Sequence, residues 1–200
     1  MSSIIQYPRI VFLGTPDFAV ASLNALIEHN YNVVAVVTAP DKPAGRGMRL
    51  KESAVKTYAT SKNIPVLQPE KLKDPQFIET LASYKADVQI VVAFRMLPEI
   101  VWNMPSMGTI NVHGSLLPNY RGAAPINWAI MNGETKTGVT TFFIDEKIDT
   151  GAIILKEETT IGPDENVGEL HDRLMHLGGD AVLKTLEIIA NENVNTIYIL

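Results

Sequence analysis

The chain contains no cysteine, and this absence excludes two kinds of structure. Its 200 residues can form no disulfide bond and offer no thiolate ligand to a metal ion. Because proteins without cysteine fit a reducing compartment, we expect a cytoplasmic protein with no disulfide partner.

Long apolar runs, targeting signals and an excess of basic residues are also lacking. No apolar run approaches the roughly 20 residues that a membrane span requires. The first residues, MSSIIQYPRI, lack the basic start and apolar stretch of a signal peptide. We therefore expect a soluble protein with no membrane partner. The net charge is −5, so any nucleic-acid partner must be bound by a local basic patch.

What the chain does have is a large apolar content. Hydrophobic residues make up 46% of the sequence, without low-complexity segments or internal repeats. This composition fits a sizeable core, and we expect residues 1–200 to form one globular domain.

Short apolar runs alternate with helical patterns along most of the chain. Such alternation predicts an α/β fold with an open, mostly parallel twisted sheet and helices on both faces. Ligands of such sheets bind beyond the carboxyl ends of the strands, here after Gly14, Ala39, Phe94 and Gly114. In the first βα connection, Thr15 is the expected helix N-cap, with Pro16 at the first helical position. The expected strands are 9–14, 31–40, 64–69, 87–94, 109–114, 137–144 and 151–161, and the expected helices are 15–30, 53–63, 74–86, 121–133 and 167–191.

The strand at residues 109–114 carries two polar side chains among apolar ones. Asn111 and His113 lie two positions apart, so they project from the same face of the strand. Burying either without a partner would cost about 1–3 kcal/mol. One interpretation is a hydrogen-bonded pair that ties the strand to a neighbouring loop. The other is a reactive pair, since the carboxyl end of the strand is accessible to a ligand.

Acidic residues in a later turn are candidate partners for the imidazole. Asp145, Glu146 and Asp149 lie between the last two strands, and from spacing alone any of them can orient a histidine for acid or base work. A metal site is less favoured, because the four histidines form no H-E-x-x-H motif. The sequence also lacks the G-x-x-x-x-G-K-S/T loop of nucleotide triphosphatases.

Four segments carry a resemblance to a known family. They read FLGTPDFA (12–19), APDKPAGRGMRL (39–50), NVHGSLLPNYRGAAP (111–125) and TGVTTFFIDEKIDTGAII (137–154). The chain resembles the folate-dependent formyltransferases, and within them the branch that acts on methionyl-tRNA. The resemblance covers nearly all of residues 9–190 and implies the Rossmann-like fold of the catalytic domain.

The resemblance implies an activity and a set of site residues. The activity is transfer of a formyl group from 10-formyltetrahydrofolate to the amino group of methionine on initiator tRNA, without a metal. Asn111, His113 and Asp149 match the catalytic residues of the family. The segment Ser115, Leu116, Leu117 and Pro118 matches the stretch that binds tetrahydrofolate.

A basic segment, DKPAGRGMRLK, distinguishes relatives within the family. Its composition predicts a mobile loop, and the resemblance implies that Arg46 and Lys42 reach the acceptor end of tRNA. The chain departs from the family at AFRMLP, which is one residue shorter than the usual A-Y-G-x-I-L-P. Arg95 stands there in place of the small Gly region. The resemblance therefore does not define the pterin pocket there. The family also has a C-terminal β-rich domain that contacts tRNA, which we expect to be absent from residues 1–200.

Three alternatives remain open from the sequence. The chain can be another folate-dependent formyltransferase, or a hydrolase of formyltetrahydrofolate in which water replaces the amine. It can also be a non-catalytic module that binds a small molecule, with Asn111 and His113 merely hydrogen-bonded.

Overall fold

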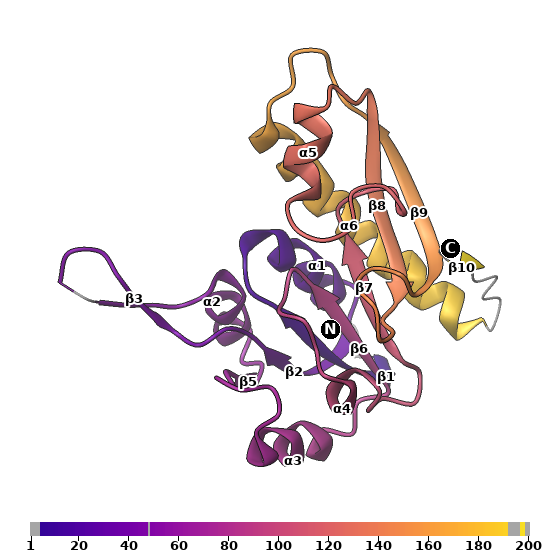
Figure 1. The fold of residues 1–200 in the computed structure, drawn as a ribbon. Coiled ribbons are helices and arrows are strands. Elements are labelled where there is room, and N and C mark those ends of the chain that lie inside the picture. Colours follow the sequence, from indigo (N-terminus) through magenta and orange to yellow (C-terminus); the bar gives the residue numbers. More distant parts are fainter. Residues whose placement is uncertain (1–4, 48, 192–196, 199–200) are drawn as a thin grey trace. The chain divides into compact units, whose positions relative to one another are not determined.

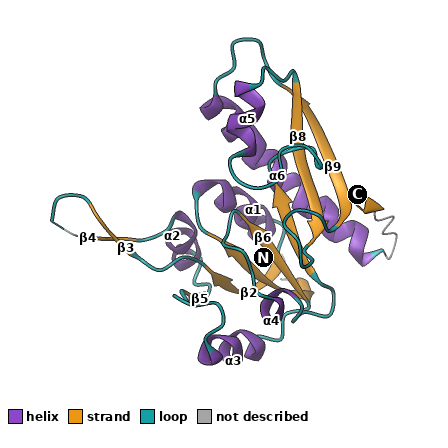
Figure 2. Ribbon diagram, viewed as in Figure 1, coloured by secondary structure: helices purple, strands orange, loops and turns teal. Residues whose placement is uncertain are grey.

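The computed structural model describes residues 5–47, 49–191 and 197–198. The chain divides into two compact units, unit 1 with residues 1–109 and unit 2 with residues 110–200. Figure 1 labels the elements of both units, and Figure 2 distinguishes their helices from their strands. Within the described ranges, no helix is long and apolar enough to cross a membrane.

Unit 1 is built on a parallel sheet. Strand β1 (Ile5–Gly14) pairs in parallel with β2 (Tyr31–Val37) and with β6 (Val88–Val92). Strand β2 also pairs in parallel with β5 (Val66–Leu67). Every residue of β6 is buried, so both faces of the sheet are covered there, as the apolar sequence of this strand predicts. The expected α/β fold with a mostly parallel sheet and helices on both faces is thus confirmed.

Four helices follow the strands of unit 1. They are α1 (Asp17–Glu28), α2 (Ala54–Ser61), α3 (Pro75–Ser83) and α4 (Glu99–Trp102). The N-cap of α1 is Pro16 rather than Thr15, which corrects the expected boundary by one residue. The backbone carbonyl of Thr15 instead accepts a hydrogen bond from the backbone N–H of Val55, 3.3 Å away. This bond ties the first βα connection to α2.

The basic segment is a β-hairpin and not the loop that its composition predicts. Strands β3 (Lys42–Ala44) and β4 (Arg49–Lys51) pair antiparallel, and all their residues are exposed. Gly45 and Gly47 have φ angles of +73° and +104°, and an added Cβ at either would meet nothing within 4 Å. The hairpin extends away from the rest of unit 1 (Figure 1). Its glycines serve the tight turn between two strands.

The strands within unit 2 pair antiparallel. Strand β8 (Lys136–Phe143) pairs antiparallel with β7 (Thr109–His113) and with β9 (Ala152–Thr160). Strand β10 (Ile197–Tyr198) pairs antiparallel with β9. The expected pairing of the two strands that flank the acidic turn is therefore confirmed.

Two helices complete unit 2. Helix α5 (Pro125–Met131) is short, and α6 (Val167–Ala190) packs against β8 and β9. The start of α6 is fixed by a capping box, in which Asn166 and Glu169 each accept a hydrogen bond from the backbone N–H of the other. The buried side chains of the unit include Ile110, Val112, Leu117, Val139, Phe142, Ile153, Leu170, Leu174 and Leu186.

A close approach between β8 and its neighbours requires a glycine. A Cβ at Gly138 would overlap the backbone carbonyl oxygen of Glu157 and would lie 2.7 Å from Cδ2 of Leu116. We expect Gly138→Ala to lower the free energy of unfolding by roughly 1–3 kcal/mol, as overpacking does. In Gly162→Ala the nearest neighbour of the new Cβ is 3.5 Å away, so this control should change little. Equal urea midpoints for the two variants would contradict the prediction.

An ion pair between the β9–α6 turn and α6 makes stability depend on pH. Arg173 donates to Glu165 at 2.6 and 2.9 Å and to the carbonyl of Thr160 at 2.7 Å. The hydrogen bond from Arg173, and then that from the backbone N–H of Gly162, hold the pKa of Glu165 below its usual value of 4.5. A carboxyl with a depressed pKa stabilises the fold above its unfolded pKa, and this contribution is lost as the pH falls through the folded pKa.

We therefore expect Arg173→Met to be less stable than the unaltered chain by up to about 1 kcal/mol at pH 7, the range of solvent-screened pairs. The difference should shrink as the pH is lowered from 5 toward 3. Denaturant unfolding at several pH values measures it, and a difference that is independent of pH would argue against the pair as its cause.

Candidate functional site

Strand β7 presents both polar side chains that the sequence singles out. Asn111 and His113 share one face of the strand, whereas the buried Ile110 and Val112 occupy the other. His113 is only 8% exposed, and Asn111 is half-buried. The imidazole thus lies at a nearly dry position at the carboxyl end of the strand.

The backbone of the following loop fixes one nitrogen of this imidazole. Nε2 of His113 lies 2.7 Å from the carbonyl oxygen of Tyr120. Because a carbonyl oxygen can only accept, Nε2 must carry a hydrogen and donate it. In the neutral imidazole Nδ1 then holds the free lone pair.

Asp149 lies on the other side of the ring. Its Oδ2 accepts a hydrogen bond from the backbone N–H of Gly122 at 2.7 Å and lies 3.7 Å from Nδ1 of His113. Asp149 is only 9% exposed. A separation of 3.7 Å is too long for a hydrogen bond, but it permits an ion pair when the imidazole is protonated. The ring is therefore oriented by the Tyr120 carbonyl, and not by a direct bond to Asp149.

The other two acids of the turn do not approach the ring. Asp145 accepts hydrogen bonds from the backbone N–H of Lys147 at 2.9 Å and from the Thr150 hydroxyl at 3.1 Å, so it shapes the turn itself. Glu146 is exposed. Of the three acids that spacing left equivalent, the structure brings Asp149 to His113.

Three residues in the loop of Tyr120 and in the turn of Asp149 adopt left-handed backbone conformations without being glycine. The φ angles are +57° at Tyr120, +55° at Ala124 and +51° at Asp149. Each such residue costs on the order of 1–3 kcal/mol, which surrounding contacts must offset. The bond from Gly122 to Asp149 and the 2.6 Å bond from the Tyr120 hydroxyl to Glu134 provide such contacts. Strain of this kind is common at ligand sites.

The amide of Asn111 is available to a ligand. Its side chain makes no hydrogen bond with any residue in the described parts of the chain. A half-buried amide without a partner offers two N–H donors and one acceptor. This arrangement favours the reactive interpretation of the Asn111 and His113 pair over the purely structural one.

The side chains of residues 115–118, which follow β7, alternate between buried and more exposed positions. The Ser115 hydroxyl donates to the carbonyl of Asn119 at 2.6 Å, and Leu117 is fully buried against Phe142 and Ile153. Leu116 is half-buried and Pro118 is exposed. The side chains of Ser115 and Leu117 therefore serve the fold, and the backbone with Leu116 and Pro118 remains for a ligand.

The basic hairpin presents the cations expected to bind tRNA. Lys42 on β3 and Arg46 in the turn are both exposed, as are Arg49 and Lys51 on β4. Four cations within ten residues form a local basic patch in a chain of net charge −5. Phosphate groups are the natural ligands of such a patch.

Arg95, the departure noted in the sequence, is bound to a neighbouring loop. Its guanidinium donates to the carbonyls of Glu70 at 3.0 Å and Pro69 at 2.8 Å, and it lies 5.2 Å from the centre of the Phe94 ring. The side chain thus ties the end of β6 to the segment after β5.

Two elements of the site were missed by sequence reasoning. They are the Tyr120 carbonyl and the Gly122 N–H, both backbone groups. The only signal for them is the turn composition of NYRG, because a backbone group does not depend on residue type. Among the described residues, no group of three or more histidines and acids is arranged to hold a metal ion.

Comparisons with known proteins identify similar sequences over most of the chain. Residues 8–186 match the family described as Formyl transferase. The chain is 64% identical over 188 residues to the methionyl-tRNA formyltransferase of Flavobacterium johnsoniae, an alignment that covers 94% of this chain and 60% of that protein. The chain thus spans about 60% of the length of the curated relatives it matches.

Solved structures share the fold at much lower identity. Glycinamide ribonucleotide transformylase 1 from Symbiobacterium toebii matches with a TM-score of 0.79 at 17% identity, covering 96% of this chain and 94% of that chain. A formyltetrahydrofolate deformylase from Pseudomonas syringae matches with a TM-score of 0.76 at 18% identity, covering 98% and 67%. These similarities concern the fold alone.

The contact with the Tyr120 carbonyl predicts the tautomer of His113. We expect ¹⁵N NMR of the ring at a pH where it is neutral to show a protonated Nε2 and an unprotonated Nδ1. The signal is assigned by its loss in His113→Gln. A neutral ring protonated at Nδ1 instead would mean that the Tyr120 carbonyl does not orient it.

Proposed function

The chain belongs to the formyl transferase family, and on that premise we propose that it carries the catalytic part of a methionyl-tRNA formyltransferase. In the proposed reaction, the formyl group of 10-formyltetrahydrofolate passes to the amino group of methionine on initiator tRNA. The observation that carries the proposal is the 64% identity to a methionyl-tRNA formyltransferase over most of the chain. The proposed substrates place the activity in the cytoplasm.

Asn111 and His113 would stabilise the charge that forms when the amine attacks the formyl carbon. The attack converts the formyl oxygen into an oxyanion, to which the Asn111 amide and a protonated His113 donate hydrogen bonds. Because Nε2 is engaged by the Tyr120 carbonyl, Nδ1 is the ring nitrogen left for the reaction. The low exposure of the ring strengthens these bonds, since little water competes for them.

Asp149 would support the movement of protons. Its carboxylate oxygen lies 3.7 Å from Nδ1 and can form an ion pair with the ring whenever the ring carries a proton on that nitrogen. Asp149 and His113 pass the proton of the attacking ammonium, directly or through water, to the folate nitrogen. That nitrogen departs with the electron pair of its bond to the formyl carbon, and collapse of the oxyanion leaves a formamide. No covalent intermediate with the protein is required.

The folate would lie along the segment from Ser115 to Pro118. Since Ser115 and Leu117 point into the protein, the contacts come from the backbone and from the side chains of Leu116 and Pro118. An apolar edge with a few backbone donors and acceptors suits a flat heterocycle.

Arg46 and Lys42 would contact phosphates at the acceptor end of the tRNA. The guanidinium of Arg46 can bind a phosphate with two hydrogen bonds, whereas Lys42 acts as a point charge. Both side chains are exposed on the basic hairpin.

Hydrolysis of the formyl donor is the nearest enzymatic alternative, because it differs only in the attacking nucleophile. The exposed basic hairpin favours the transferase, since a hydrolase of a small folate has no need of a polyanionic partner. A non-catalytic binding module is less favoured, because the Asn111 amide makes no hydrogen bond within the described parts of the chain.

Variants of the three proposed catalytic residues test this function. We expect Asn111→Ala and His113→Ala each to reduce formyl transfer to methionyl-tRNA by at least ~10²-fold, the usual loss of an oxyanion donor. Asp149→Asn should also be strongly impaired, because it removes the carboxylate that lies 3.7 Å from Nδ1 of His113 and takes part in the proposed proton transfer. Glu146→Gln is the matched control, since it removes an exposed acid from the same turn, and it should remain active.

The assay uses the complete protein that carries this chain and, in parallel, residues 1–200. Thermal unfolding with tetrahydrofolate measures binding separately, because a ligand of the folded state raises the unfolding temperature by mass action. Full transfer by the alanine variants would overturn the mechanism. Cleavage of formyltetrahydrofolate without any transfer to methionyl-tRNA would instead identify a hydrolase.

A further inference from the structure

Among the described residues of the basic hairpin formed by β3 and β4, no buried side chain fixes the direction of the hairpin. All six residues of its strands are exposed, including Leu50 at 68%. A Cβ added at Gly45 or Gly47, in its turn, would meet no atom within 4 Å. The direction in which its cations point must therefore be set where the hairpin joins the rest of unit 1.

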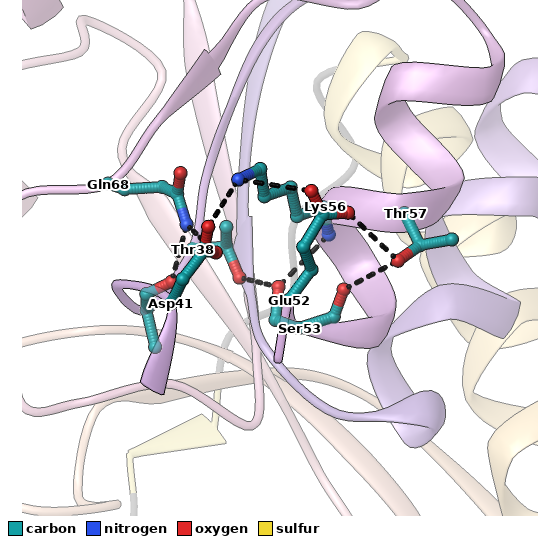
Figure 3. Close-up of polar contacts among 8 residues, drawn as sticks. Thr38, Asp41, Glu52, Ser53, Lys56, Thr57 and Gln68 are labelled. Atoms are coloured by element: carbon teal, nitrogen blue, oxygen red, sulfur yellow. Dashed lines mark hydrogen bonds and ion pairs between the residues drawn. The ribbon is translucent and has the colours of Figure 1, made fainter. Parts of the chain in front are cut away.

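A single ammonium group joins the two ends of the hairpin. Asp41 directly precedes β3 and Glu52 directly follows β4. Nζ of Lys56, on helix α2, lies 2.7 Å from Oδ2 of Asp41 and 3.3 Å from Oε1 of Glu52. Figure 3 shows the three side chains together, with Lys56 between the two carboxylates.

Further hydrogen bonds tie this bridge to the sheet. Gln68, just after β5, donates to Oδ1 of Asp41 at 2.7 Å and to the carbonyl of Ala39 at 3.0 Å. The hydroxyl of Ser53, the N-cap of α2, lies 2.6 Å from the hydroxyl of Thr38. Both oxygens of Asp41 are thus bound (Figure 3). The base of the hairpin is held by α2 and by the ends of β2 and β5.

The bridge remains charged at neutral pH. The hydrogen bond from Lys56, followed by that from Gln68, lowers the pKa of Asp41 from 3.8. The bond to Asp41 raises the pKa of Lys56 above 10.5. The side chains of Lys56 and Asp41 are about one-fifth exposed, at 20% and 22%, so water screens this pair less than it screens a fully exposed one.

We propose that Lys56 is a positioning residue that holds the basic hairpin in the direction required to bind the acceptor end of tRNA. The RNA partner in this inference rests on the proposed function, whereas the role of Lys56 in fixing the hairpin does not depend on it. Without Lys56, the carboxylates of Asp41 and Glu52 lose their common partner. They are then free to attract Lys42 and Lys51, the hairpin cations adjacent to them in sequence.

The direction of the hairpin can be measured directly, because the chain has no cysteine. Spin labels attached through Ala44→Cys on β3 and Glu79→Cys on α3, both exposed, report the distance between hairpin and helix in unit 1. We expect Lys56→Met to broaden this distance distribution. Asp41→Asn should broaden it as well, because it removes the charge of the carboxylate that Lys56 binds. Lys62→Met, which removes a cation from the C-cap of the same helix α2, should leave it narrow. An unchanged distribution in Lys56→Met overturns the proposal whatever the function.

Kinetics test the consequence for RNA binding. If only a third to a tenth of the hairpins retain the binding direction, the KM for methionyl-tRNA should rise by roughly three- to tenfold. The KM for 10-formyltetrahydrofolate and kcat should stay within about twofold, because Lys56 touches neither proposed catalytic residue nor folate segment. Lys62→Met should behave as the unaltered protein. A KM for methionyl-tRNA that is equal in the two lysine variants would overturn the role in binding.

The spin-label distances and the kinetics together distinguish a failure of the proposed function from a failure of the present inference. If the unaltered complete protein transfers no formyl group to methionyl-tRNA, the proposed function fails and the spin-label distances still decide whether Lys56 fixes the hairpin. If transfer is normal and Lys56→Met changes neither distance nor KM, only the present inference fails.

Discussion

The hydrogen bond from Nε2 of His113 to the Tyr120 carbonyl is the interaction on which the candidate site depends. It commits one ring nitrogen to the backbone and leaves the other, Nδ1, facing Asp149. The carboxylate is itself fixed by the Gly122 N–H, two residues beyond Tyr120. One loop therefore places both partners of the imidazole, and a change in its backbone would displace them together.

This loop and the turn that carries Asp149 maintain their shape at an energetic cost. Tyr120 and Ala124 in the loop, and Asp149 in the turn, adopt backbone conformations that residues with a side chain rarely take. Hydrogen bonds from the Tyr120 hydroxyl and the Gly122 N–H offset part of that cost. Since these bonds also define the surroundings of His113, the stability of the loop and the geometry of the site have the same origin.

Much of the fold follows from the sequence, because periodic apolar patterns and capping residues act locally. Strand β6, with every residue buried, and helix α3, with Asp74 as its cap and Pro75 at its start, are examples. The hairpin was not predicted, since glycine and charged residues favour a loop and only cross-strand pairing stabilises β3 and β4. Nor did spacing select Asp149 among three acids. That choice depends on the left-handed backbone at residue 149 and on a backbone donor at Gly122, neither of which has a side-chain signature.

The strands of the two units differ in how far along the chain they must search for partners. In unit 2, β8 pairs with β7 and β9, its neighbours in sequence, so only short segments need to close. In unit 1, β1 pairs with β6, and two-thirds of that unit lies between them. Because contact order slows folding, the antiparallel strands that carry His113 can assemble early. The parallel strands of unit 1 pair completely only after β1 and β6 have come together across the long segment between them.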